Sequence, residues 1–235
     1  PGLLHAGILR PDYAHARILS IDTSEAEKCE GVVKVITGED ADLYYGDNIR
    51  DLTPMAVDRV LYIGHPVAAV VAEKLSQAKE AVKKIKVEYE PLPVYTEARA
   101  ALGEDAVLIH ENSGDFWHLP GIEPIPGTNI ANRYTVKKGD VKKGFAEADV
   151  TVEGDFNYPF GSCSAIEPHG SIVWFHEDDT IEAWSSSICP FIIREELARV
   201  YGLPISDVRV HIPELGGCFG YKSDITVEQT IAYIA

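Results

Sequence analysis

The stretch Glu214–Asp224 reads ELGGCFGYKSD, and the interpretation of the whole chain depends on it. Three glycines, Gly216, Gly217 and Gly220, stand around one phenylalanine, and a lysine follows them. Glycine is unfavourable inside regular structure, and it is used where the backbone needs a positive φ or where something approaches the chain closely. The stretch therefore predicts a tight loop, and the question is what that loop approaches.

The flanking sequence places this loop between a strand and a helix. Residues 206–215 read as a strand, and residues 223–235 begin a helix with Ser223 or Asp224 as its N-cap. Such a position presents backbone N–H groups and the positive end of a helix dipole, which favour anions and oxo groups. The letters fit neither a dinucleotide fingerprint nor a P-loop. From this stretch alone, a cofactor loop and a plain glycine turn remain equally open.

Composition is that of an ordinary globular protein. The chain has 235 residues, of which 46% are hydrophobic and 25% charged, enough for one large domain or two modest ones. A formal net charge of −16 argues against binding to nucleic acid or an anionic membrane. No apolar run approaches the roughly 20 residues that span a bilayer. Four cysteines without a C-x-x-C pair, and no visible signal peptide, predict reduced thiols, no metal ligands and a cytoplasmic location.

The first part of the chain alternates strand and helix signals up to about residue 95. A short helix is expected after Thr23 or Ser24, and Ser24 with Glu27 has the form of a capping box. Residues 96–132 are rich in Pro, Gly and Asn and show no sustained period, so we expect a linker that contains the domain boundary.

Regular patterns resume from residue 133. Residues 133–160 read as a strand, a short helix and a long strand, and residues 170–187 read as a hairpin that turns at EDDT. A helix is expected over residues 191–203, with Gly202 as its C-cap. Both ends of the chain lie inside periodic patterns, so we expect a fragment of a longer polypeptide.

Several segments together resemble the molybdenum hydroxylases, the family of xanthine dehydrogenase and aldehyde oxidase. The loop GGCFGYK is similar to that family's G-G-x-F-G-x-K loop. The other similar segments are RPDYAHARILSIDTSEA, GVVKVITGED, YIGHPVAAVVAE, VEYEPLP, AIEPHGSIV and YGLPISDVRV. Because the matches keep the family's order over nearly the whole chain, the chain is identified as a member of this family.

The resemblance implies the architecture and the cofactor. It implies a mixed α+β fold, with an α/β hammerhead domain over residues 1–95, a linker over 96–132, and the start of the first molybdopterin-binding domain over 133–235. In the family, the matching loop lies against the molybdenum group. The cofactor-binding residues implied here are Gly216, Gly217, Cys218, Phe219 and Gly220.

The resemblance also implies an activity. The chain would be part of the large catalytic subunit of an oxidoreductase that hydroxylates an aldehyde, carbon monoxide or an N-heterocycle with oxygen from water. Molybdopterin, in its cytosine dinucleotide form, would work with iron–sulfur clusters and FAD on partner subunits or domains, in a dimer of heterotrimers. The family's catalytic Glu lies near the far end of the subunit and has no match here, so we assign no catalytic residue and expect the isolated chain to be inactive.

Four positions depart from the family pattern. Ile188 stands where the family carries a Gln beside the metal, and isoleucine cannot hydrogen-bond an oxo group. Cys218 and Tyr221 replace loop glycines, and Ser223 stands where xanthine enzymes carry a Glu, which disfavours xanthine. We place Ile188, Cys189 and Tyr221 in a candidate substrate pocket. The alternative is a non-catalytic remnant or assembly module of such a complex.

The remaining polar candidates are interpreted as structural. Glu167 and His169 could form an acid–base pair, but a structural carboxylate in the E-P segment is the commoner case. We expect His5, His15 and His65 to be ordinary packed or hydrogen-bonded histidines of the first domain.

Overall fold

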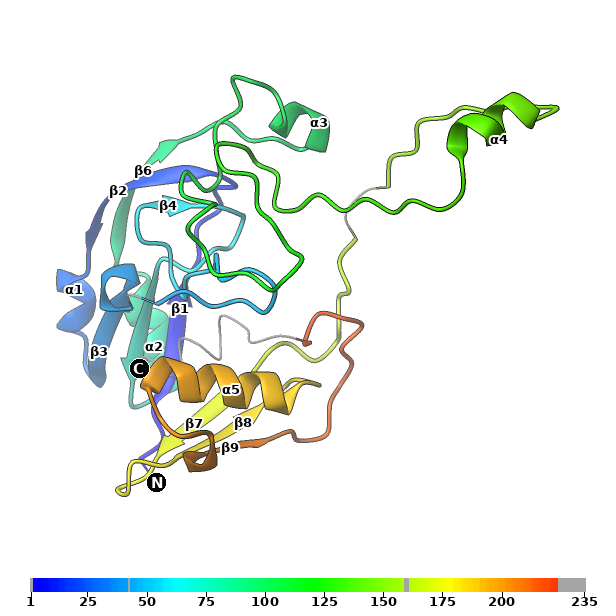
Figure 1. The fold of residues 1–235 in the computed structure, drawn as a ribbon. Coiled ribbons are helices and arrows are strands. Elements are labelled where there is room, and N and C mark those ends of the chain that lie inside the picture. The colour runs from blue at the N-terminus through cyan, green and yellow to red at the C-terminus, as the bar shows by residue number, and fades with distance from the viewer. Residues whose placement is uncertain (1, 42, 159–160, 224–235) are drawn as a thin grey trace.

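The structure is a computed structural model that describes residues 2–41, 43–158 and 161–223 (Figure 1). The helix expected from residue 223 onward lies almost wholly outside the described residues, so that expectation stays a prediction. None of the helices in the described ranges is long and apolar enough to cross a membrane.

The first part of the chain contains two antiparallel sheets of three strands each. The first sheet has the order β1 (His5–Leu9), β5 (Ala68–Ala72) and β3 (Val32–Thr37), and the second has β4 (Arg59–Val60), β2 (Ala16–Asp22) and β6 (Lys86–Pro91). All five residues of β5 are buried, because this central strand is covered on both faces. Helix α2 (Leu75–Val82) packs on β1 and β5 through its buried alanines.

The short helix α1 (Ser24–Glu27) begins where the sequence places it, but the expected capping box is wrong. Thr23 is the N-cap, and the Ser24 hydroxyl donates to Asp22 Oδ1 at 2.6 Å instead of closing a box with Glu27. The carboxylate two residues upstream is within direct reach, so it competes successfully for the hydroxyl. The 3₁₀ helix η1 (Gly38–Asp40) does carry a capping box, formed by Thr37 and Asp40.

The connecting residues 96–132 contain the short helix α3 (Ala98–Ala101) and otherwise follow an irregular path. The Asn129 amide group holds this path together, because its nitrogen donates to the carbonyls of Ala101 and Val107 and its oxygen accepts from the Ile109 N–H. Two backbone hydrogen bonds attach the segment to the first part of the chain, from the Arg50 N–H to the Trp117 carbonyl and from the Leu119 N–H to the Asn48 carbonyl, each at 2.9 Å. The exact domain boundary stays a prediction.

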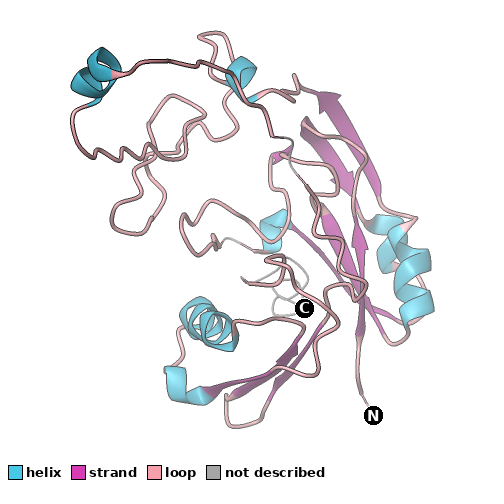
Figure 2. Cartoon of the chain, turned by 90° about the vertical axis from the view of Figure 1, so that its right-hand side faces the viewer, coloured by secondary structure: helices cyan, strands magenta, loops and turns pink. Residues whose placement is uncertain are grey.

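The last part is a three-stranded sheet covered on one face by a helix (Figure 2). Its elements are β7 (Ser171–Phe175), β8 (Ile181–Ser185), α5 (Pro190–Tyr201), the 3₁₀ helix η2 (Ile205–Asp207) and β9 (Val208–His211). The expected hairpin and helix are confirmed, and Gly202 ends α5 in the left-handed conformation at φ +63°. Tyr45 of the first part is buried in the core between this sheet and α5, so the two parts pack together.

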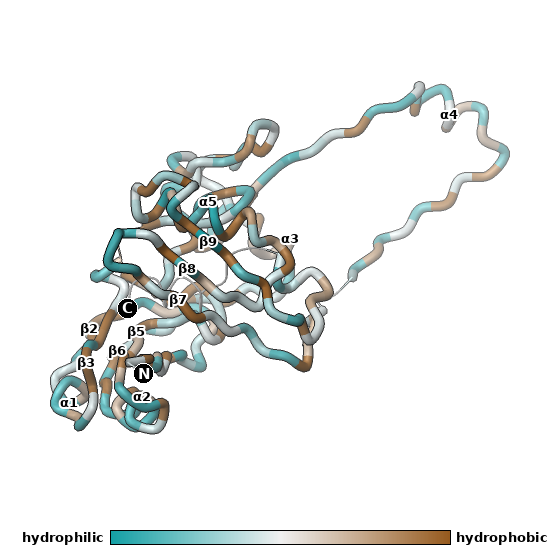
Figure 3. Tube along the Cα trace, turned by 90° about the horizontal axis from the view of Figure 1, so that it is seen from below, coloured by the Kyte–Doolittle hydropathy of each residue, from teal (hydrophilic) through white to brown (hydrophobic). Residues whose placement is uncertain are grey.

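Residues 131–158, called the arm from here on, project away from the rest of the molecule (Figures 1 and 3). The arm contains the expected short helix α4 (Val141–Glu147), but the strands expected on both sides of it are wrong. A strand needs a neighbour for its backbone hydrogen bonds. Within the described residues, no strand pairs with the arm, and every residue of the arm is exposed.

Candidate cofactor-binding loop

The glycine loop leaves β9 and runs beside the segment that leads into β7 (Figure 1). Glu167 connects the two segments, because its Oε2 accepts from Lys222 Nζ at 2.5 Å, from the Gly216 N–H at 2.8 Å and from the Ser186 hydroxyl at 3.2 Å. The Lys222 side chain has no exposed surface. One carboxylate therefore holds both ends of the loop to the end of β8, and we call this arrangement the Glu167–Lys222 clamp.

The turn between β8 and α5 is attached to the same point. The carbonyl of Lys222 accepts from the Ile188 N–H and from the Ser187 hydroxyl, each at 3.0 Å. The Ser187 oxygen in turn accepts from the Cys189 N–H at 3.0 Å. Ile188 and Cys189 therefore lie next to the glycine loop, although the Ile188 side chain is 52% exposed.

The loop backbone has an unusual shape. Gly217 and Gly220 have φ values of +102° and +91°, and Phe219, a non-glycine residue, also has a positive φ of +54°. Within the described residues, the backbone N–H groups of Gly217, Cys218, Phe219 and Gly220 donate no hydrogen bond. Successive N–H groups around left-handed residues form a concave binding place for anions. The loop therefore offers four backbone donors to a group outside the described residues.

The three glycines have different surroundings. A Cβ on Gly216 would stand 2.6 Å from Glu167 Cβ, so glycine here allows the clamp to form. A Cβ on Gly217 would stand 3.0 Å from the Phe219 ring. A Cβ on Gly220 would meet no described atom within 4 Å. The space beside Gly220 is open to a group that is not part of the described chain.

Aromatic side chains surround the loop at its exposed rim. Phe219 is 74% exposed, and the Tyr221 ring stacks on His169 with ring centres 4.3 Å apart. The Cys163 thiol donates to the Phe219 carbonyl at 2.9 Å. Exposed rings held by such contacts are available to pack against a bound molecule or another protein segment.

The clamp sets the charge of the loop. The hydrogen bond from Lys222, followed by the one from the Gly216 N–H, lowers the pKa of Glu167 below its ordinary value of 4.5. Glu167 is therefore ionised at neutral pH and balances the charge of Lys222. The attraction for an anionic ligand comes from the free N–H groups and not from the lysine.

The stabilising effect of the clamp is expected to disappear in acid. Because the pKa of Glu167 is lower in the folded state, the stabilisation is complete above pH 4.5 and is lost as the pH falls through the lowered value. We expect the melting temperature of the full-length wild-type subunit to exceed that of Glu167→Gln at neutral pH. The difference should shrink below pH 4.5. An equal difference at every pH would show that the carboxylate charge does not contribute.

The other polar candidates have structural surroundings. His15 is buried and its Nδ1 lies 2.8 Å from the Pro93 carbonyl oxygen. His65 is buried and stacks on Tyr62, and burial lowers its pKa to about 4. Glu167 is a structural carboxylate, as expected. Its place in the clamp was not anticipated.

A separate cavity of about 690 Å³ lies beside the first domain, away from the glycine loop. It is lined in part by Asp51, Arg59, His65 and His110. Burial raises the pKa of Asp51 and lowers that of His110, whose Nε2 lies 3.5 Å from Asp51 Oδ2. In the described ranges, no group of three or more His, Cys, Asp and Glu residues could hold a metal ion.

Two family models match the chain. Residues 1–93 match the a/b hammerhead domain of aldehyde oxidase and xanthine dehydrogenase, and residues 122–235 match the molybdopterin cofactor-binding domain. The chain belongs to the molybdenum hydroxylase family. The expected mixed α+β fold, a hammerhead domain followed by a cofactor-binding domain, is thereby confirmed.

Individual molybdenum hydroxylases agree with this assignment. The xanthine dehydrogenase molybdenum-binding subunit of Escherichia coli is 30% identical over 99% of this chain and 31% of its own length. Subunit gamma of the 6-hydroxypseudooxynicotine dehydrogenase complex of Paenarthrobacter nicotinovorans is 34% identical over 99% of this chain and 29% of its own length. The structure of the reconstituted CO dehydrogenase from Oligotropha carboxidovorans is similar with a TM-score of 0.87 at 28% sequence identity. The match covers 100% of this chain and 30% of that one. The chain thus spans about a third of the length of these relatives.

Proposed function

We propose that these residues form part of the large catalytic subunit of a molybdenum-pterin oxidoreductase, and that the loop from Gly216 to Gly220 holds the cofactor. One observation carries the proposal. Four consecutive backbone N–H groups have no acceptor within the described residues, and the space beside Gly220 is open. A plain turn needs neither feature.

The residues of the loop fit a cofactor with anionic and oxo atoms. The N–H groups of Gly217, Cys218, Phe219 and Gly220 would donate to those atoms, and the absence of a side chain at Gly220 would let them come close. Because the clamp fixes both ends of the loop, these donors are positioned before the cofactor arrives. When bound, a molybdenum-pterin group supplies two-electron oxidation of a carbon centre with oxygen from water.

The side chains at the rim of the loop suit a small, largely apolar substrate. Ile188 and Tyr221 present exposed apolar surface next to the loop, and Cys189 lies at the start of α5. We propose an aldehyde, carbon monoxide or an N-heterocycle as the substrate class. Ser223 in place of an acidic residue disfavours xanthine.

Partner proteins and location are also part of the proposal. Two relatives named above are subunits of larger enzymes, one of them explicitly subunit gamma of a complex. We propose that iron–sulfur and FAD subunits accept the electrons, that the cofactor is the cytosine dinucleotide form, and that the complex is a cytoplasmic dimer of heterotrimers.

A second candidate function rests on one residue. Ile188 cannot donate the hydrogen bond that the family's Gln supplies, so the subunit could have kept its fold and assembly role without catalysis. Its backbone N–H is already used by the Lys222 carbonyl. Only the side chain distinguishes this chain from an active relative at that position.

Metal and pterin analysis of the full-length complex separates the two functions. We expect one molybdenum and one pterin per large subunit, together with turnover of at least one substrate of the three classes. A complex without molybdenum, expressed in a host that makes the cofactor, would favour the assembly module.

The isolated 235-residue chain is expected to bind no molybdenum stoichiometrically and to turn over no substrate. Most of the length of the relatives lies outside it, so the cofactor would be held on one side only. Metal analysis of the purified chain tests this directly. Recovery of one molybdenum per chain would contradict the expectation.

A further inference from the structure

The arm carries a sequence pattern that its surroundings do not satisfy. From residue 150 to 158, apolar residues alternate with polar ones, which is the pattern of a strand with one buried face. The polar positions are Thr151, Glu153, Asp155 and Asn157. The apolar positions Val150, Val152, Phe156 and Tyr158 are 78%, 92%, 97% and 95% exposed.

The backbone of the same segment is also unpaired. No strand is assigned in the arm. Residues 150–158 make no backbone–backbone hydrogen bond to any described residue. Its polar side reaches the region of α3, where Asp155 accepts from Arg99 at 2.8 Å and Asn157 donates to Glu97 at 3.3 Å. An apolar face and a row of free backbone groups on one extended segment are the two requirements of a docking strand.

The three-stranded sheet of the same domain shows a similar lack of cover. The face of β7 opposite α5 exposes Ile172 and Trp174, at 48% and 56%. Two apolar surfaces in one domain point to a large covering body rather than a short peptide.

The lengths of the relatives indicate what that body is. The cofactor-binding domain model includes the whole arm, yet the chain spans only about 30% of the relatives. We propose that residues 150–158 form a strand that pairs with the part of the same subunit lying outside these 235 residues. A partner subunit or a second copy of the chain could pair with this segment only if the rest of the subunit left it uncovered. The inference concerns assembly of the subunit and does not depend on cofactor binding.

Hydrogen exchange on the full-length subunit tests the inference. The subunit is measured alone at two concentrations and again in the assembled complex, with peptides covering residues 150–158. Amides of this segment should exchange about a hundredfold more slowly than an unpaired chain in all three samples. Slow exchange that appears only at the higher concentration would indicate a second copy, and slow exchange only in the complex would indicate another subunit. Either result, or fast exchange throughout, would overturn the proposal.

A matched pair of variants supplies an independent readout. Val152→Asp places a charge on the apolar side, and Thr151→Asp places the same charge one residue away on the polar side. We expect Val152→Asp to speed amide exchange in residues 150–158 at least about tenfold, and Thr151→Asp to leave the exchange rate unchanged. Peptides from β5 serve as an internal control for global unfolding. Equal effects of the two variants would contradict a one-sided strand.

Discussion

Replacing Lys222 by methionine in the full-length subunit is expected to lower its molybdenum content, because removing a group that supports a metal site typically costs about tenfold or more in affinity. Methionine fills the buried space but cannot donate to Glu167, which then holds Gly216 and Ser186 only. The end of the loop loses its fixed position, and the N–H donors no longer converge. The melting temperature of the cofactor-free subunit should fall by a few degrees.

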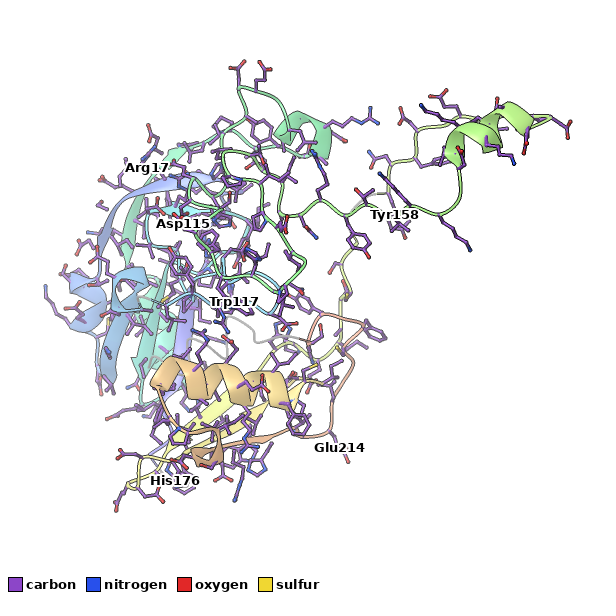
Figure 4. All side chains as sticks on the ribbon, in the orientation of Figure 1. Arg17, Asp115, Trp117, Tyr158, His176 and Glu214 are labelled. Carbon is purple, nitrogen blue, oxygen red and sulfur yellow. The ribbon has the colours of Figure 1, made fainter. Side chains whose placement is uncertain are left out.

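Glu167→Gln tests the clamp from the other side. The amide keeps the shape of the carboxylate but leaves a fully buried ammonium group without its counter-charge, so we expect a larger loss of stability than from Lys222→Met. Glu214→Gln is the control, because Glu214 is exposed, lies just before the loop and makes no hydrogen bond within the described residues (Figure 4).

Combining the two changes separates charge balance from loop position. The double variant Glu167→Gln with Lys222→Met has neither charge, so part of the stability should return while the molybdenum content stays low. Full molybdenum content in Lys222→Met would contradict a role of the clamp in holding the cofactor.

Gly220→Ala is expected to abolish cofactor binding while the subunit remains folded. At φ +91° a side chain costs about 1 kcal/mol in backbone strain, and the added methyl group would occupy the open space beside the loop. The chain provides a matched control in Gly202, which has φ +63°, also has no described atom within 4 Å, and ends α5. Gly202→Ala imposes similar strain away from the loop.

The comparison of these two glycine variants isolates the docking role. Both should lower the melting temperature of the cofactor-free subunit by similar amounts, but only Gly220→Ala should lose molybdenum. Equal molybdenum content in both variants would show that the loop is a simple turn without a role in cofactor binding.

Local signals made much of the fold predictable. The turn at residues 177–180 and the glycine that ends α5 depend on neighbours in sequence, and both are found where they were expected. The β-rich run of residues 67–72 is also a local signal, and it forms the buried strand β5. The strands of the arm failed because a strand also depends on a partner, and the described chain contains none.

The clamp could not be predicted because its two residues are 55 positions apart. No periodicity connects Glu167 with Lys222, and each letter alone is compatible with a solvent-exposed charge. The resemblance placed both within family segments without pairing them. The loop position was predicted from its glycines, whereas the separate role of Gly216 in admitting Glu167 becomes visible only in three dimensions.

Hydrogen exchange of a peptide covering residues 216–222 in the complete complex, with and without cofactor, tests the central claim most directly. Four of its backbone N–H groups have no acceptor within the described residues, so in the cofactor-free complex they should exchange rapidly. Loading the cofactor should slow them by at least about tenfold, while peptides of β5 stay unchanged. Identical exchange of the loop peptide in the loaded and cofactor-free complexes would contradict the claim that this loop holds the cofactor.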